Sequence, residues 1–249
     1  MNEKSRVATN YSKEAVRAPA GSEFFGYLRA LGAVVWKDLA AELRSRELLS
    51  AMLVFALLVI LIFNFALDLD PQTRQKSAVT AGVLWVTFTF AGTLGLNRSM
   101  AIEKDRGCLD GLLLAPVDRT AIYFGKVIGN LIFMFLVEII VLPVYSILYN
   151  LNLFQPGLLL ATALGSVGYV VVGTLLSTMA VQARTRDILL PILLFPVVLP
   201  AILGAVKAST GFLDGIAFAD IRPWINLLIA YDVIFLAIAF MVFDFVVEE

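Results

Sequence analysis

The sequence predicts an all-α integral membrane protein, a bundle of six transmembrane helices preceded by an amphipathic helix at the membrane surface. Three observations support this fold class. The 249 residues are 60% hydrophobic and 16% charged, whereas a soluble domain is about 45–50% apolar and roughly 25% charged. The charged residues are segregated, so that long stretches carry none. Six of these stretches have about the 20 residues that a helix needs to cross a bilayer.

The composition also excludes several classes of function. The chain has no histidine, which excludes Ser-His-Asp triads and His-ligated zinc or haem. Its single cysteine, Cys108, cannot form an internal disulfide or a Cys-x-x-Cys redox pair. A net charge of -1 offers no general attraction to nucleic acid. We therefore expect a membrane protein that is not an enzyme and that binds no metal or cofactor directly.

The chain begins with two different segments before the first apolar run. The polar residues 1–22 predict a disordered cytoplasmic tail. Residues 24–46 predict an amphipathic helix on the inner leaflet, because apolar residues recur at spacings of three and four and Trp36 favours the headgroup layer. A helix packed on a partner protein is the alternative. The apolar face consists of Phe24, Leu28, Leu31, Val35, Leu39 and Leu43.

Six apolar segments follow, and each predicts a transmembrane helix. They span residues 48–67, 78–96, 121–148, 157–181, 188–206 and 224–243. Pro191, Pro196 and Pro200 in the fifth segment predict either static kinks or a gating hinge. The stretch 207–223 predicts a loop or short helical pieces at the membrane surface. Small residues four apart permit close helix approach, within the chain or at a homodimer seam; the pairs are Gly125 with Gly129, Ala161 with Gly165 and Gly173 with Ser177.

Two carboxyl groups lie inside predicted spans, Glu138 in the third and Asp232 in the sixth. At a rise of 1.5 Å per residue, both are expected in the outer half of their helices. A charge at mid-bilayer costs about 2.5–3.5 kcal/mol on insertion scales, so both side chains should face the bundle interior. They indicate either an intramembrane polar site, with Lys207 as a counter-charge, or neutral carboxyls that lock two helices together.

The cytoplasmic loop 98–120, between the second and third spans, is the most informative connection. Leu109, Leu112 and Leu113 are spaced so that they share one face of a short helix. Pro116 then ends this helix. A helix of roughly two turns is not stable alone in water, and exposed leucines need a surface that covers them. Either the headgroup layer or a protein partner can supply that surface.

The same residues resemble a known family, the haem exporter protein B (CcmB) family. The resemblance is carried by DRGCLDGLLLAP at 105–116, in a six-span chain of this length. The runs GVLWV at 82–86, LGLNR at 94–98 and WKDL at 36–39 also fit the family's pattern. The similarity covers about residues 28–243, although the 105–116 pattern also occurs loosely in other ABC-2 type permeases.

The resemblance implies the membrane permease subunit of an ABC-type complex in cytochrome c maturation, with the architecture of an ABC-2 type permease. It also implies that the loop helix is a coupling helix that docks on a separate ABC ATPase subunit. This agrees with the sequence around Gly125-Lys126-Val127, which lacks the upstream glycine and the Ser/Thr of a phosphate-binding loop. ATP would therefore act through the partner. The coupling-loop residues would be Glu103, Asp105, Gly107, Leu109, Asp110, Leu112, Leu113 and Pro116.

Further partners follow from the resemblance alone. They are a haem-handling C subunit, a small single-span D subunit and the periplasmic haem chaperone, in the bacterial inner membrane. Haem is the candidate cargo, and the resemblance leaves open whether this subunit moves haem or only transmits ATP-driven motion. The alternative is an ABC-2 type permease for another cargo, such as a polysaccharide or a drug. An intramembrane enzyme would need clustered nucleophiles or metal ligands, and the Asp and Glu residues are scattered.

The basic residues predict the orientation, because Lys and Arg are enriched on the cytoplasmic side of membrane proteins. Fifteen lie before the first span, around the second-to-third connection or in the fourth-to-fifth connection, and four lie in the other connections. We predict that both termini and the loop 98–120 face the cytoplasm. Alkaline phosphatase fused after Glu249 should be inactive, and the same enzyme fused after Leu151 should be active. Phosphatase activity after Glu249 would reverse the assigned topology.

Overall fold

A computed structural model describes residues 20–67, 76–105, 118–180 and 186–246, and within these ranges every regular element is a helix. Six of the helices, from α3 to α9, are long and apolar enough to cross a membrane. The predicted all-α fold with six spans is therefore confirmed. The helices are α2 (Ala20–Ser45), α3 (Glu47–Leu67), α4 (Lys76–Asp105), α6 (Arg119–Tyr149), α7 (Pro156–Ala180), α8 (Arg186–Leu213) and α9 (Phe218–Val246).

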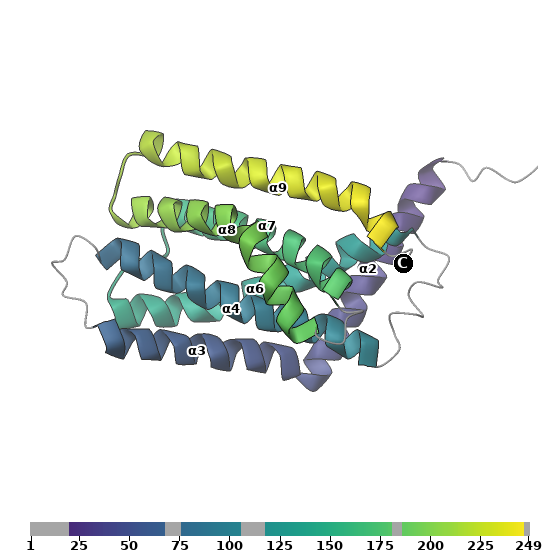
Figure 1. The fold of residues 1–249 in the computed structure, drawn as a ribbon, viewed down its shortest axis with the longest axis horizontal. Coiled ribbons are helices and arrows are strands. Elements are labelled where there is room, and N and C mark those ends of the chain that lie inside the picture. Colours follow the sequence, from purple (N-terminus) through teal and green to yellow (C-terminus); the bar gives the residue numbers. More distant parts are fainter. Residues whose placement is uncertain (1–19, 68–75, 106–117, 181–185, 247–249) are drawn as a thin grey trace, which may run out of the picture.

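The six long helices run along the long axis of the molecule, and α2 crosses one end of them (Figure 1). The helices α4 and α7 are central, since most residues in the most apolar stretch of each are buried. In α3, α8 and α9, about a third or less of the residues in the corresponding stretch are buried. Their exposed side chains are large and apolar, as at Phe65, Leu199 and Met241. Lipid tails solvate such a surface, whereas water would not.

The helices α4, α8 and α9 extend well beyond the predicted spans. Hydropathy shows which part of a helix can lie in a membrane, but it does not show where the helix ends. The helix α4 continues to Asp105 through residues such as Met100 and Glu103, which favour helix. The stretch 207–223, predicted as a loop or short pieces, consists mainly of the end of α8 and the start of α9. The turn between them contains Gly215 with a φ of 68°, a backbone conformation that favours glycine.

The helix α2 begins at Ala20, before the predicted start at 24, and residues 1–19 of the predicted tail lie outside the described residues. Val34 packs on α6, where a Cβ added to Gly125 would lie 2.8 Å from the Val34 Cβ. Leu31 and Val35 belong to the apolar face that was predicted to meet the membrane. Because of the contact at Val34, both are instead partly buried against the bundle. The large apolar side chains that are exposed on α2 are Phe25, Leu28, Trp36 and Leu43, and Arg29 and Arg44 are exposed on the same helix.

The helices α4 and α7 pack closely against each other in the core. Trp85 on α4 is buried, and its indole N–H donates to Ser209 Oγ on α8 at 3.0 Å. A Cβ added at Gly165 of α7 would lie 2.1 Å from the Trp85 ring. One at Gly173 would lie 2.3 Å from Leu96. The small residues predicted to permit close helix approach therefore serve packing within the chain at these positions.

The helix α8 is bent (Figure 1). Three prolines lie within it, and each removes a backbone donor from the helical hydrogen bonds. The Tyr231 hydroxyl on α9 donates to the carbonyl of Val197 at 3.0 Å. A side chain from a neighbouring helix thus contacts the backbone in the proline-containing part of α8.

We predict that Gly165→Ala destabilises the bundle by about 1–3 kcal/mol, because the Trp85 ring is fixed by Ser209 and cannot give way. Gly82→Ala is the matched control, since a Cβ there meets no atom within 4 Å. Thermal unfolding of the purified protein in detergent, followed by tryptophan fluorescence, should show a lower midpoint for Gly165→Ala only. Equal midpoints for the two variants would contradict the assigned packing.

Candidate functional site

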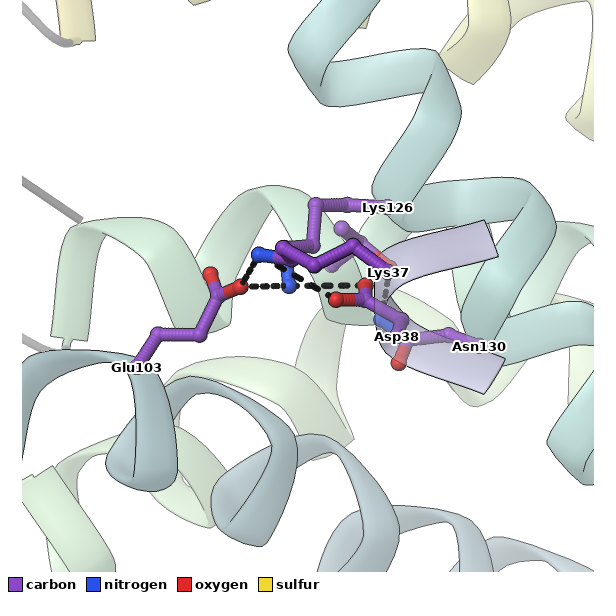
Figure 2. A network of polar contacts seen from close by, with 6 residues as sticks. Lys37, Asp38, Glu103, Lys126 and Asn130 are labelled. Carbon is purple, nitrogen blue, oxygen red and sulfur yellow. Dashed lines mark hydrogen bonds and ion pairs between the residues drawn. The ribbon is translucent and has the colours of Figure 1, made fainter. Parts of the chain in front are cut away.

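Four charged side chains from three helices converge where α2 crosses the bundle (Figure 2). Lys37 and Asp38 come from α2, Glu103 from α4 and Lys126 from α6. The Lys126 Nζ lies 2.5 Å from Glu103 Oε1 and 2.8 Å from Asp38 Oδ2. The Lys37 Nζ contacts the same Glu103 Oε1 and lies 3.3 Å from Asp38 Oδ1. Charges therefore alternate in a closed ring, which we call the ion cluster.

The ion cluster is buried on one side and open on the other. Lys126 is 4% exposed and Glu103 is 6% exposed, whereas the Lys37 side chain is 40% exposed. Burial alone would lower the pKa of Lys37, but the hydrogen bond and charge of Glu103, with the charge of Asp38, outweigh it and raise the pKa above its usual value. Lys37 is therefore charged at physiological pH.

A cleft of about 140 Å³ adjoins the ion cluster. It lies between α2, the start of α3, α4 and α6, and its polar lining includes Glu42, Ser45 and Ser99 besides the four charged residues. A volume of this size holds several waters, because each water takes up about 30 Å³ in the liquid. The cleft therefore leaves space between the end of α4 and α2 that side chains do not fill.

The joint between α2 and α3 is fixed by side-chain capping. Arg46 links the two helices with a φ of 55°, in the left-handed region that non-glycine residues rarely adopt. The buried Glu42 accepts a hydrogen bond from the backbone N–H of Leu49 at 2.8 Å, which caps the first turn of α3. At the surface nearby, Arg98 on α4 pairs with Glu47 at 2.5 Å. Both contacts hold α3 in place beside the ion cluster.

The two predicted intramembrane carboxyls are both buried and both face α7, but on different sides of it. Glu138 accepts a hydrogen bond from the Ser166 hydroxyl, which joins α6 to α7. Asp232 packs at Gly168, where an added Cβ would lie 2.4 Å from its Oδ1. Neither Asp232 oxygen has a hydrogen-bond partner within the described part of the chain. Asp232 lies at the midpoint of α9 and not in its outer half, because α9 begins at Phe218.

Lys207 does not act as the counter-charge that the sequence suggested. Its side chain is exposed, and within the described ranges it makes no ion pair with Glu138 or Asp232. The lysine lies in the last two turns of α8. The extension of α8 to Leu213 explains the difference, because it fixes Lys207 on a helix where a loop was expected.

The structure separates Glu103 from the other predicted coupling-loop residues. Glu103 is not in a loop, because α4 continues to Asp105, and its carboxylate belongs to the ion cluster. Asp105 is the last residue of α4. The remaining members, Gly107, Leu109, Asp110, Leu112, Leu113 and Pro116, lie outside the described residues. The helix α6 begins soon after, where Asp118 accepts a hydrogen bond from the Thr120 N–H at 2.9 Å.

Sequence reasoning did not identify three members of the ion cluster. In the sequence, Lys37 and Asp38 stand out only as part of the WKDL run, and Lys126 only in the Gly125-Lys126-Val127 run that lacks the features of a phosphate-binding loop. One signal for Lys126 was available, because it follows Ala121–Gly125 inside an apolar helix. A lysine in such a position normally pairs with a carboxylate. The identity of that carboxylate depends on how α2, α4 and α6 meet.

Comparisons with known proteins agree over most of the chain. The family described as "CcmB protein" matches residues 29–248. The chain is 26% identical over 188 residues to Heme exporter protein B of Rhodobacter capsulatus, covering 74% of this chain and 84% of that protein. It is 24% identical to the Pseudomonas aeruginosa protein of that name over 191 residues (75% and 83%), and 24% identical to the Bradyrhizobium diazoefficiens one over 189 residues (76% and 84%).

We predict that Lys126→Met lowers the free energy of unfolding by about 3–5 kcal/mol, because it removes a buried cation from between two carboxylates. Arg98→Met is the matched control, since it breaks the half-exposed pair with Glu47 and should cost less than about 1 kcal/mol. Chemical unfolding in mixed micelles measures both values. If the two variants are equally stable, the ion cluster contributes no more than a surface pair.

Proposed function

This chain belongs to the CcmB protein family, and on that premise we propose that it is the membrane permease subunit of an ABC-type haem exporter that acts in cytochrome c maturation. The match over residues 29–248 carries the proposal, because it includes all six spanning helices and most of α2. The relatives named Heme exporter protein B are covered over more than four fifths of their length.

In this proposal the end of the bundle that α2 crosses faces the cytoplasm of a bacterial inner membrane. The exposed apolar side chains of α2, such as Trp36 and Leu43, enter the inner leaflet. Exposed arginines on the same helix, Arg29 and Arg44, reach the anionic headgroups. The orientation of α2 across the long helices supports this placement, because a surface helix lies in the plane of the membrane (Figure 1).

ATP energy enters from a separate ABC ATPase subunit, which docks on the connection between α4 and α6. That connection leaves α4 at Asp105 and enters α6 at Arg119, on the same side of the bundle as α2. The side chains that flank it, Glu103 and Lys126, are joined to each other and to α2. A push on the connection would therefore reach helices that are already tied together.

The other partners of the complex are a haem-handling C subunit, a single-span D subunit and a haem chaperone on the outer side. Haem is the cargo of the complex, and ATP-driven motion of this subunit delivers haem or releases the loaded chaperone. Glu138 acts in the bundle as a neutral carboxyl that locks α6 to α7 through Ser166. The same carboxyl is the first candidate if an intramembrane polar site is needed for transport.

We predict that Leu112→Asp together with Leu113→Asp prevents recovery of the ATPase with this subunit. Each buried leucine stabilises by about 1.5–3 kcal/mol, so a loss of about 4 kcal/mol would weaken docking by about a thousandfold. The six spans should still insert, because none is altered. Affinity purification of the complex from membranes measures the amount of bound ATPase.

The matched control is Ile216→Asp with Ala217→Asp, in the exposed turn between α8 and α9 at the end of the bundle away from α2. This variant should retain the ATPase. Normal recovery of an active ATPase with the Leu112 and Leu113 variant would refute docking through this helix. Loss of the ATPase from both variants would point to general damage and also count against the assignment.

A further inference from the structure

The contact between α4 and α2 depends on charge and not on close packing. The helix α2 packs on α6, where Val34 meets Gly125. Its contact with the end of α4 is the ion pair of Lys37 with Glu103. The cleft of about 140 Å³ lies beside this pair and is lined by both helices. The end of α4 is therefore attached to α2 by an interaction that can break without opening a packed core.

The ion cluster contains a second way of pairing its charges. Asp38 lies 3.3 Å from the Lys37 Nζ and 2.8 Å from the Lys126 Nζ. If Glu103 withdraws, each lysine still has Asp38 as a partner. Neither lysine is then left without a counter-charge, which would be most costly for the buried Lys126. The ring is therefore able to exist with Glu103 inside it or outside it.

The state with Glu103 inside the ring is itself incompletely satisfied. Glu103 Oε1 is shared between Lys37 and Lys126, whereas Glu103 Oε2 is buried and has no hydrogen-bond partner among the described residues. An unsatisfied buried carboxylate oxygen raises the energy of this state. Movement of Glu103 into the adjoining cleft would expose this oxygen to water. The state with Glu103 inside the ring and the state with Glu103 outside it are therefore closer in free energy.

Glu103 also occupies the position at which force would arrive. It lies two residues before the end of α4, where the connection to α6 begins. Under the proposed function, on which this inference rests, that connection contacts the ATPase. A helix transmits displacement along its axis, so movement of the connection shifts Glu103 before it shifts the rest of the bundle. The next contacts in line are Lys37 on α2 and Lys126 on α6.

We propose that Glu103 is a positioning residue for transport, whose ion pairs with Lys37 and Lys126 open and close once in each ATP cycle and pass the movement of α4 to α2 and α6. The ion cluster switches between a state with Glu103 inside the ring of charges and a state with Glu103 outside it. Two sites change the balance between these states: the contact with the ATPase, and the transport path between the helices. Coupling between two sites typically changes an equilibrium affinity by 5- to 150-fold.

The test uses the whole complex and measures three quantities: the ATPase recovered with this subunit, ATP hydrolysis, and cytochrome c matured per ATP hydrolysed. Glu103→Gln keeps the shape and removes the charge. We expect normal recovery of the ATPase, continued hydrolysis, and a fall of about tenfold in cytochrome matured per ATP. Glu103→Asp keeps the charge, and it should restore most of the yield per ATP.

A second variant guards against loss of folding. Lys37→Gln removes only the ion pair of Glu103 with α2. The buried pairs of Lys126 with Glu103 and with Asp38 stay intact. It should fold normally and show the same lower yield per ATP. Arg98→Gln is the control, because it breaks the ion pair of α4 with α3 at the same end and should leave the yield unchanged.

The inference is overturned if Glu103→Gln and Lys37→Gln both mature cytochrome at the normal yield per ATP. It is also overturned if Glu103→Asp is as defective as Glu103→Gln, or if Arg98→Gln uncouples equally. If no ATPase is recovered with the unaltered subunit, the proposed function itself is refuted. The amount of bound ATPase therefore distinguishes failure of the proposed function from failure of the role of Glu103.

Discussion

The hydrocarbon core of a bilayer offers no hydrogen-bond partners, and this constraint governs the whole structure. Every backbone N–H and C=O in a span must be satisfied within the protein, so each span is a helix. Three threonines of α4 follow the same rule. The hydroxyls of Thr87, Thr89 and Thr93 donate to carbonyls four residues earlier, at 2.7–2.8 Å. These three hydroxyls therefore do not require water.

The same constraint changes what holds the helices together. Between spans there is no strong hydrophobic driving force, because lipid tails are as apolar as leucine. Close packing and hydrogen bonds between helices replace it. Tyr123 donates to the carbonyl of Val171 and Tyr145 to that of Thr80, each at 2.8 Å. The large ring of Trp85 fills the space that Gly165 leaves. The helices with most of these contacts, α4 and α7, occupy the centre.

At the end crossed by α2 the constraint weakens, and the character of the contacts changes. Charged groups replace hydroxyls, and a cleft lined by both polar and apolar side chains adjoins them. The ion cluster at this end joins three helices without a packed interface between α2 and α4. A bundle that is rigid in its core and held by exchangeable charges at one end suits a subunit that must receive movement from outside the membrane. Under the proposed function, movement of the ATPase would enter the bundle at this end.

Local properties of the sequence determined the membrane class and the six spans, since hydropathy and residue spacing are read over about 20 neighbouring residues. They also identified Glu138 and Asp232 as buried carboxyls, because an ionisable group inside an apolar run must face the interior. They placed helix ends less well. Residues 97–105 and 207–213 are polar or mixed and yet remain helical, because polarity moves a helix out of the membrane without ending it.

Only the tertiary structure decided which charges meet. The sequence places Glu103 and Lys126 on different helices, and it assigned Glu103 to a loop. Their contact with each other and with Asp38 depends on how far each helix is rotated about its axis. Packing sets that rotation, for example where the missing side chain of Gly125 admits Val34. It likewise decided that Ser166 and not Lys207 faces Glu138. Such pairings depend on the geometry of several helices at once, and no single stretch of sequence contains that information.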